Sequence, residues 1–222
     1  MNKATQKTES PKDALIAYLH KHKIDFELKG DNLTVGGSLG LQDCTGITAL
    51  PDNLTVGGSL DLSGTGITAL PDNLTVGGSL YLRGTGITAL PDNLTVGGSL
   101  YLSGTGITAL PDNLTVGGSL GLQDCTGITA LPDNLTVGGS LYLRDGLLNV
   151  AYKKNCGNQN RTIFAAWVNG EIQIGAGCFL GPIQKFFDAV GESYSGGSAK
   201  KYKDDAQSCI DSLVKKLNKS AA

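Results

Sequence analysis

Leucine, valine and isoleucine recur along residues 29–146 with a period of about twenty positions. In the copy LPDNLTVGGSLDLSGTGITA, which spans 50–69, the apolar positions are Leu50, Leu54, Val56, Leu60, Leu62 and Ile67. Leu54 and Val56 are separated by two positions, as are Leu60 and Leu62, which is the period of a strand with one buried face. The pattern therefore predicts short strands rather than helices, and the glycines of every copy, with a proline in all copies but the first, oppose a helix as well.

The copies differ slightly in length. Twenty-residue copies occupy 50–69, 70–89 and 90–109, longer copies with QDCTG in place of SGTG occupy 29–49 and 110–130, and a partial copy covers 131–146. One copy is too small to enclose a core, but copies stacked about 4.8 Å apart can share one. We expect a mainly β chain whose centre is a parallel β-solenoid of six coils, a right-handed β-helix.

Glycines and turn residues divide each copy. Gly57-Gly58 separates the two apolar pairs, Gly64 and Gly66 flank Thr65, and Pro51-Asp52-Asn53 is typical of a turn. We expect these glycines to make sharp corners with positive φ. Each copy should then contain three short strands, the third around Ile67.

The repeat resembles a known family. The run LxLxxTxIxxLPxxL at 60–74 is similar to the 20-residue bacterial leucine-rich repeat of secreted effectors, and the resemblance implies a recognition face on the LxL strand. Two departures, Thr65 in place of asparagine and an additional VGG, favour a straighter solenoid than the family's horseshoe. The whole repeat also resembles the LPDNLTVGGSLDLSGTGIT tandems of enterobacterial and bacteriophage proteins, which implies a phage or prophage origin.

Residues 1–28 are expected to cap the first coil. Ser10 is a candidate N-cap followed by Pro11, and a stripe of Leu15, Ile16 and Leu19 follows. Residues 24–28 alternate as a strand that could pair with the first coil. The cap is needed because a solenoid otherwise exposes apolar edges at its ends.

Residues 147–222 have a different composition and predict a small α+β domain. Two apolar runs, 162–168 and 171–175, flank Asn169-Gly170, which is typical of a hairpin. Amphipathic helices are expected over 182–190 and 204–217. The domain could be a cap for the last coil or a separate binding module.

Charge and cysteine content exclude several classes of protein. Residues 29–146 carry ten acidic and three basic residues, and 147–222 carry six acidic and ten basic ones. A nucleic-acid binder would have one strongly basic stripe, and a membrane protein a long apolar span. The five cysteines form no CxxC pair, and the N-terminal residues do not resemble a signal peptide. We expect a soluble protein of the reducing bacterial cytoplasm without metal, cofactor, nucleic acid or membrane.

The residues suited to catalysis are few. His20 and His22 are expected to lie on the surface of the first helix. Cys209 and Asp211 match the Cys-x-Asp of a ubiquitin-ligase domain that follows leucine-rich repeats in some effectors, but that domain is several times longer than this tail. An aspartate recurs at each turn, and we expect it to form turns rather than bind calcium. The sequence predicts a protein that is not an enzyme.

The copies differ chiefly at the outward positions of the LxL strand. The residue between the leucines is Gly40, Asp61, Tyr81, Tyr101, Gly121 and Tyr142 in turn, and the residue after them is Gln42, Ser63, Arg83, Ser103, Gln123 and Arg144. Tyrosine and arginine are enriched at interface hot spots, although tyrosine ladders also stabilise sheets. The predicted contact residues are Asp61, Tyr81, Arg83, Tyr101, Tyr142 and Arg144.

Two functions are consistent with these patterns. The first is a non-enzymatic, phage- or prophage-encoded protein that binds and inhibits a host defence protein. The second is a structural β-helix, such as a virion component or a self-assembling rod, and the lack of a fibre-like low-complexity segment disfavours it.

Overall fold

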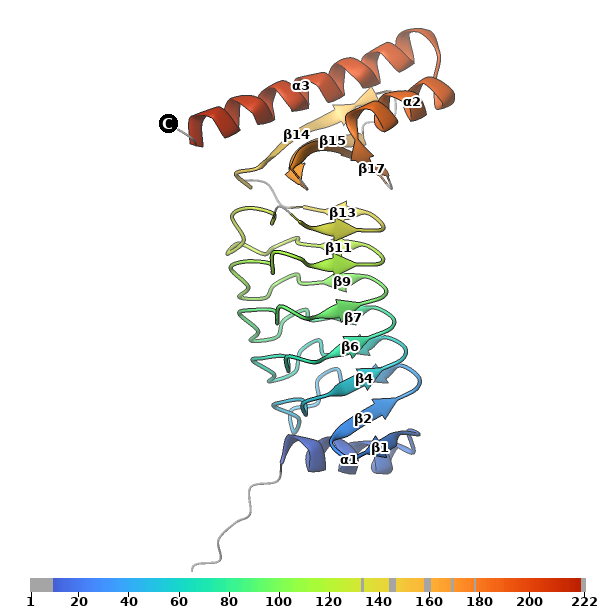
Figure 1. Cartoon of the computed structure of the whole chain (residues 1–222), viewed down its shortest axis with the longest axis vertical. Coiled ribbons are helices and arrows are strands. Elements are labelled where there is room, and N and C mark those ends of the chain that lie inside the picture. The colour runs from blue at the N-terminus through green and yellow to red at the C-terminus, as the bar shows by residue number, and fades with distance from the viewer. Residues whose placement is uncertain are drawn as a thin grey trace, which may run out of the picture.

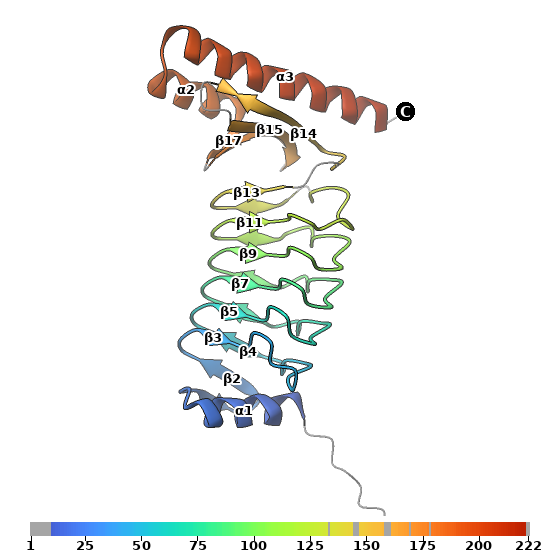
Figure 2. The ribbon, with the colours of Figure 1, turned by 180° about the vertical axis from the view of Figure 1, so that it is seen from behind.

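The computed structural model describes residues 10–132, 134–143, 147–157, 161–168, 170–177 and 179–220. The repeats form a single column of stacked coils (Figure 1). A helix, α1 (Pro11–His22), lies across one end of the column, and a sheet covered by two helices lies across the other, as the opposite view also shows (Figure 2). The predicted parallel β-solenoid with two different ends is confirmed.

Each of the six copies contributes one strand to each of two sheets. The first sheet has the order β1 (Glu27–Lys29), β2 (Asn32–Val35), β4 (Leu54–Val56), β6 (Thr75–Val76), β8 (Thr95–Val96), β10 (Thr115–Val116) and β12 (Thr136–Val137). The second has the order β13 (Leu141–Tyr142), β11 (Leu120–Gly121), β9 (Leu100–Tyr101), β7 (Leu80–Tyr81), β5 (Leu60–Asp61) and β3 (Leu39–Gly40). Apart from the antiparallel β1–β2 pair, all pairs in these two sheets are parallel and join equivalent residues of adjacent copies.

The core consists of the apolar positions that the repeat predicts. Leu54, Val56, Leu60, Leu62 and Ile67 are fully buried, and their counterparts in the neighbouring coils lie in the same continuous core. Burying such a side chain stabilises the fold by roughly 1.5–3 kcal/mol. Because every coil adds the same set, the stabilisation accumulates along the column.

The prediction of a third strand in each copy is wrong. Ile67 is fully buried, but the residues around it form no strand. The chain turns there because Leu62 O accepts hydrogen bonds from the Thr65 N–H (3.1 Å) and from Thr65 Oγ1 (2.7 Å). Thr65 is buried and satisfied within its own coil, and so are Thr85 and Thr105.

The expectation of positive φ holds for only some of the glycines. Gly64 has a φ of 69°, and Asp43 and Asp124 adopt similar angles at the same position of the longer copies. Gly57 and Gly58 do not have positive φ and are required for a different reason. A Cβ at Gly57 would lie 2.4 Å from Gly36 O, and one at Gly77 would lie 2.3 Å from Gly57 O. These glycines allow the backbones of successive coils to approach each other.

The N-terminal cap forms as expected. Ser10 Oγ accepts from the Asp13 N–H (3.1 Å) at the start of α1, and Leu15 and Leu19 are fully buried in the solenoid core. The strand expected over 24–28 is observed as β1, which is shorter and begins at Glu27. It pairs with β2 of the first coil, as expected. This end of the core is therefore covered by helix and strand together.

The C-terminal unit contains an antiparallel sheet with the order β14 (Val150–Cys156), β15 (Arg161–Val168), β16 (Glu171–Ala176) and β17 (Phe179–Pro182). The expected hairpin is confirmed as β15 and β16. Side chains of β15 alternate between two cores. Phe164, Ala166 and Val168 pack against the last coil, and Ile163 and Ala165 pack against the helices. The unit therefore caps the solenoid core. A cap for the last coil was one of the two roles that the sequence left open for this domain.

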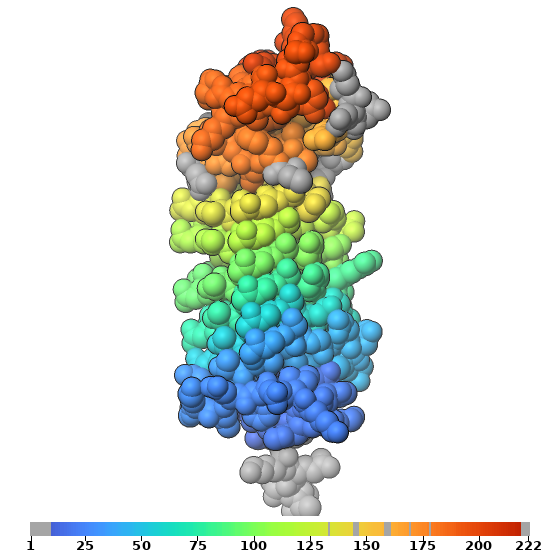
Figure 3. Space-filling view, turned by 90° about the vertical axis from the view of Figure 1, so that its right-hand side faces the viewer, coloured from blue at the N-terminus to red at the C-terminus, as the bar shows by residue number. Residues whose placement is uncertain are grey.

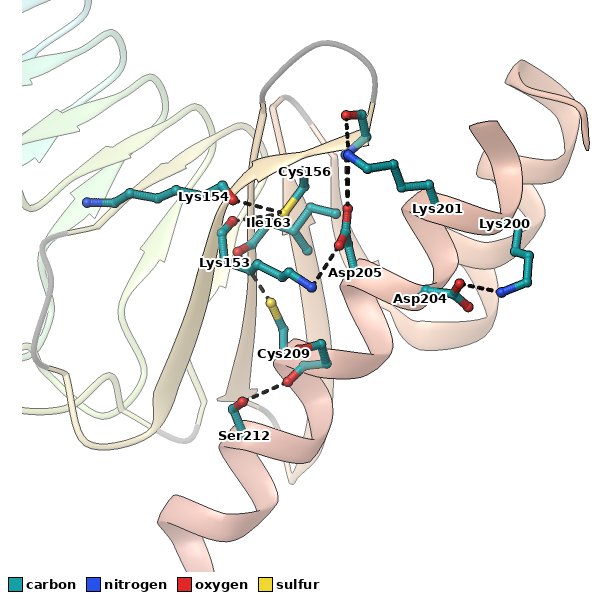
Figure 4. Close-up of polar contacts among 12 residues, drawn as sticks. Lys153, Lys154, Cys156, Ile163, Lys200, Lys201, Asp204, Asp205, Cys209 and Ser212 are labelled. Carbon is teal, nitrogen blue, oxygen red and sulfur yellow. Dashed lines mark hydrogen bonds and ion pairs between the residues drawn. The ribbon is translucent and has the colours of Figure 1, made fainter. Parts of the chain in front are cut away.

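Two helices cover the far side of this sheet. They are α2 (Ile183–Ser193) and α3 (Gly196–Ser220), and α3 begins eight residues before the segment expected from the hydrophobic pattern. Asp205 on α3 ties the helix to the sheet: it pairs with Lys153 (2.8 Å) and accepts from the Gly157 N–H (3.0 Å) (Figure 4). Burial alone would raise the pKa of Asp205, but these two donors and the charges of Lys153 and Lys201 outweigh it and lower the pKa.

Candidate functional site

The outward residues of the LxL strands lie in one row. Strand register places Asp61 beside Tyr81, Tyr81 beside Tyr101, Tyr101 beside Gly121, and Gly121 beside Tyr142. The coils follow one another along the long axis of a narrow body (Figure 3), and the row runs from coil to coil in the same direction. The parallel register thus brings together residues that are about twenty positions apart in sequence.

Tyr81 and Tyr101 form a stacked pair at the centre of the row. Their ring centroids are 5.0 Å apart and the ring planes differ by 14°. Tyr101 also lies over Gly121, since a Cβ on that glycine would lie 2.9 Å from Tyr101 Cδ1. Both tyrosines remain half-exposed, so the stacked pair presents an aromatic surface to solvent.

The polar neighbours of the tyrosine pair differ in how firmly they are held. Asp61 accepts from Gln42 Nε2 (2.7 Å) and from the Ser63 N–H (2.9 Å), which fixes its carboxylate in the row. Arg83 is exposed. Arg144, the last of the predicted contact residues, lies outside the described residues.

Tyr142 is separated from the stacked pair by Gly121. Its side chain is 46% exposed, on the edge strand β13. It borders a cleft of about 600 Å³ between the last coil and the C-terminal sheet, which also includes Tyr152, Lys154, Arg161 and Phe164. The predicted row therefore ends at a hollow that sequence periodicity cannot indicate, because more than half of the residues that line it lie outside the repeats.

Tyr18 is another residue that the repeat pattern does not indicate. Its hydroxyl donates to Gly40 O (2.9 Å), at the first position of the row. Burial, followed by the hydrogen bond and charge of Cys44, raises the pKa of Tyr18. The apolar stripe of the first helix predicts that the helix contacts the solenoid, but it does not predict the hydrogen bond of Tyr18.

The candidate catalytic residues do not form one cluster, since His20 and His22 lie on α1 whereas Cys209 and Asp211 lie on α3. The rings of His20 and Phe26 meet edge to face, and the rings of His22 and Tyr18 are stacked. Cys209 is buried in the C-terminal core with Sγ 3.5 Å from Ile163 O, and burial raises its pKa to about 12. A thiol in this state supplies very little thiolate near neutral pH.

The turn aspartates form no cation site in the described part of the chain. No group of three or more histidine, cysteine or acidic side chains lies close enough to hold a metal ion among residues 10–220 with their gaps. The adjacent asparagines bond between coils instead, as Asn73 does with Asn53 (3.1 Å).

None of the helices within the described residues combines the length and the apolar character needed to cross a bilayer.

Comparison of the chain with models of protein families, with curated proteins and with solved structures finds no match in any of the three.

Proposed function

We propose that this chain is a non-enzymatic repeat protein that binds a partner protein through the outward row of its second sheet. The observation that carries the proposal is the stacked, half-exposed Tyr81–Tyr101 pair in a row where the copies differ. Aromatic side chains contribute large contact area at small entropic cost and are enriched at hot spots. Arg83 adds an exposed cation beside the pair.

The resemblance of the repeat to enterobacterial and bacteriophage tandems supports a phage or prophage origin and action in the bacterial cytoplasm. On this proposal the partner is a host defence protein, which the chain inhibits by occupying its surface. The similarity to the bacterial leucine-rich repeat supports the same strand as recognition face. Inhibition would then require neither catalysis nor a cofactor.

The capped ends support binding over self-assembly. A self-assembling rod would grow by adding coils to exposed strand edges and apolar ends. Here α1 covers one end, with Leu15 and Leu19 in the core, and β15 covers the other, with Phe164 and Val168 in the core. Both ends are closed by segments of different sequence from the repeats.

Affinity capture from bacterial lysate tests the proposal. The bait is the full chain, compared with Tyr81→Ala/Tyr101→Ala and with the matched control Thr75→Ala/Thr95→Ala, which changes exposed residues of the same two coils on the other sheet. We expect one bacterial protein to be captured by the wild type and the control and lost with the tyrosine variant. A drop of roughly 2 kcal/mol or more, about thirtyfold, is the size expected of a hot spot.

Two results would overturn the proposal. One is a partner that binds the tyrosine variant as strongly as the wild type, and the other is a chain that captures no bacterial protein reproducibly. Unfolding of each bait in urea shows whether a loss of binding reflects loss of fold, since an exposed cross-strand pair contributes only about 1 kcal/mol.

A further inference from the structure

The last strand of the second sheet, β13, has an edge that no strand of the described residues covers. In the first five copies, both leucine N–H groups of the LxL strand donate to a carbonyl of the next coil, as that of Leu122 does to Tyr142 O (2.8 Å). The equivalent groups of the last coil are the N–H groups of Leu141 and Leu143, which therefore point away from β11. Neither donates a hydrogen bond to any residue in the described part of the chain.

The opposite end of the solenoid is closed by groups of the chain itself. The antiparallel strand β1 covers β2 at the start of the first sheet. At the start of the second sheet, the Tyr18 hydroxyl donates to Gly40 O (2.9 Å). The open edge of β13 departs from this arrangement, and unpaired N–H groups on a strand edge are a template for pairing with another segment.

The open edge forms one wall of the cleft of about 600 Å³ that Tyr142 borders. Leu141 and Leu143 line the cleft from the coil, and Tyr152 and Phe164 contribute rings from the C-terminal sheet. The volume is within the range of ligand sites, which occur preferentially where two structural units meet. Because the C-terminal sheet lies across this end of the column (Figure 1), a second solenoid could not stack on the edge, whereas a single extended segment could enter.

From this arrangement we infer that the cleft binds an extended segment of the partner protein, which adds a strand to the second sheet beside β13. The donors of Leu141 and Leu143 are two positions apart, which matches the carbonyls that an extended chain presents on one side. Side chains of the added strand would alternate, so apolar ones would face Phe164 and those between them would extend the outward row beyond Tyr142. The inference rests on the proposed function, because the added strand would bring the partner against this row.

Selection from a displayed library of random peptides on the immobilised full chain, followed by hydrogen exchange, tests this inference without knowledge of the partner. We expect the enriched peptides to carry apolar residues two positions apart. Binding of a selected peptide should protect the amides of Leu141 and Leu143. With the peptide at ten times its Kd, their exchange should slow roughly tenfold.

Two variants at one position separate the backbone donor from the side chain. Leu143→Pro removes an N–H that points away from β11, and an edge strand tolerates proline at such a position. Leu143→Ala shortens the side chain but keeps the donor, so it is the matched control. We expect a selected peptide to bind Leu143→Pro at least roughly tenfold more weakly than Leu143→Ala, because a peptide carbonyl loses its donor. Equal urea midpoints verify that both variants fold, and amide protection in the wild type decides the matter if Leu143→Pro does not.

The inference fails if the library shows no apolar alternation, if a selected peptide leaves both amides unprotected, or if it binds the two folded variants equally. It also fails if these amides are protected in a dimer of the free chain, because the edge would then belong to a second copy. Failure of the proposed function is a different result. A partner that is lost with Tyr81→Ala/Tyr101→Ala but captured equally by Leu143→Pro and Leu143→Ala leaves the row as a binding face and removes only the added strand.

Discussion

The side chain of Asn149 pairs with the backbone of Leu131 as a neighbouring strand would. Its Nδ2 donates to Leu131 O (2.8 Å), and its Oδ1 accepts from the Leu131 N–H (2.9 Å). The same Nδ2 donates to Trp167 O (3.2 Å). One buried amide thus joins the last coil to the C-terminal sheet, where the repeat ends and no further coil supplies these hydrogen bonds.

Replacing this amide should destabilise the junction. In Asn149→Ala the buried N–H and C=O of Leu131 lose their partners, and each unsatisfied group costs roughly 1–3 kcal/mol. We expect the free energy of unfolding in urea to fall by about 3 kcal/mol. Asn218→Ala, which changes an exposed asparagine of α3, should have almost no effect, and similar losses in the two variants would contradict the role of Asn149.

The close approach of the coils predicts that the same substitution has different effects on stability in two copies. An alanine Cβ at Gly77 would lie 2.3 Å from Gly57 O, whereas one at Gly36, the equivalent position of the first copy, meets nothing within 4 Å. Gly77→Ala should cost about 3 kcal/mol by forcing coils apart. Gly36→Ala should leave stability unchanged or raise it by up to about 1 kcal/mol. Urea unfolding of both variants checks this, and equal effects would be inconsistent with the stacking.

The contacts of Asp205 predict an acid-sensitive contribution to stability. Because its pKa is lowered in the folded chain, the contribution is present above the ordinary pKa of about 3.9 and is lost as pH falls through the folded-state value. Asp205→Asn should therefore be less stable at pH 7 by roughly 1–2 kcal/mol, and the difference should shrink below about pH 4.

Urea unfolding from pH 3 to pH 7 measures this difference. Asp204→Asn provides the control because Asp204 pairs with Lys200 at the surface, where both side chains are mostly exposed. Its stability should follow that of the wild type at every pH. A wild-type advantage over Asp205→Asn that persists unchanged at pH 3 would contradict the assignment.

Burial of the thiols predicts their order of reaction. Cys44, Cys125, Cys156 and Cys209 form no disulfide, and all except Cys44 are buried. Burial, the largest influence on each, raises the pKa of Cys156 and Cys209. With iodoacetamide at pH 8, peptide mapping should find Cys44 alkylated first among these four thiols, and Cys209 only after denaturation. Labelling of Cys209 in the native protein at the rate of Cys44 would show that the C-terminal core opens readily.

The sequence by itself determined the solenoid and its outward row. The spacing of Leu54, Val56, Leu60 and Leu62 fixes which face of each strand is buried, because side chains alternate along a strand. Parallel stacking of equivalent residues then follows from the repeat, so Tyr81 and Tyr101 had to be neighbours. Asn169-Gly170 between two apolar runs also predicted the hairpin of β15 and β16.

Only the tertiary structure decided the features that depend on contacts outside the repeat. The period does not show that Thr65 turns the chain where a third strand was expected, or that Gly57 serves the approach of two backbones rather than a positive φ. The cleft beside Tyr142 and the pairing of Asn149 with Leu131 arise where the repeat meets a sheet of unrelated sequence. Local periodicity specifies which side chains are buried, but the angle at which two different units pack depends on the shapes of both surfaces together.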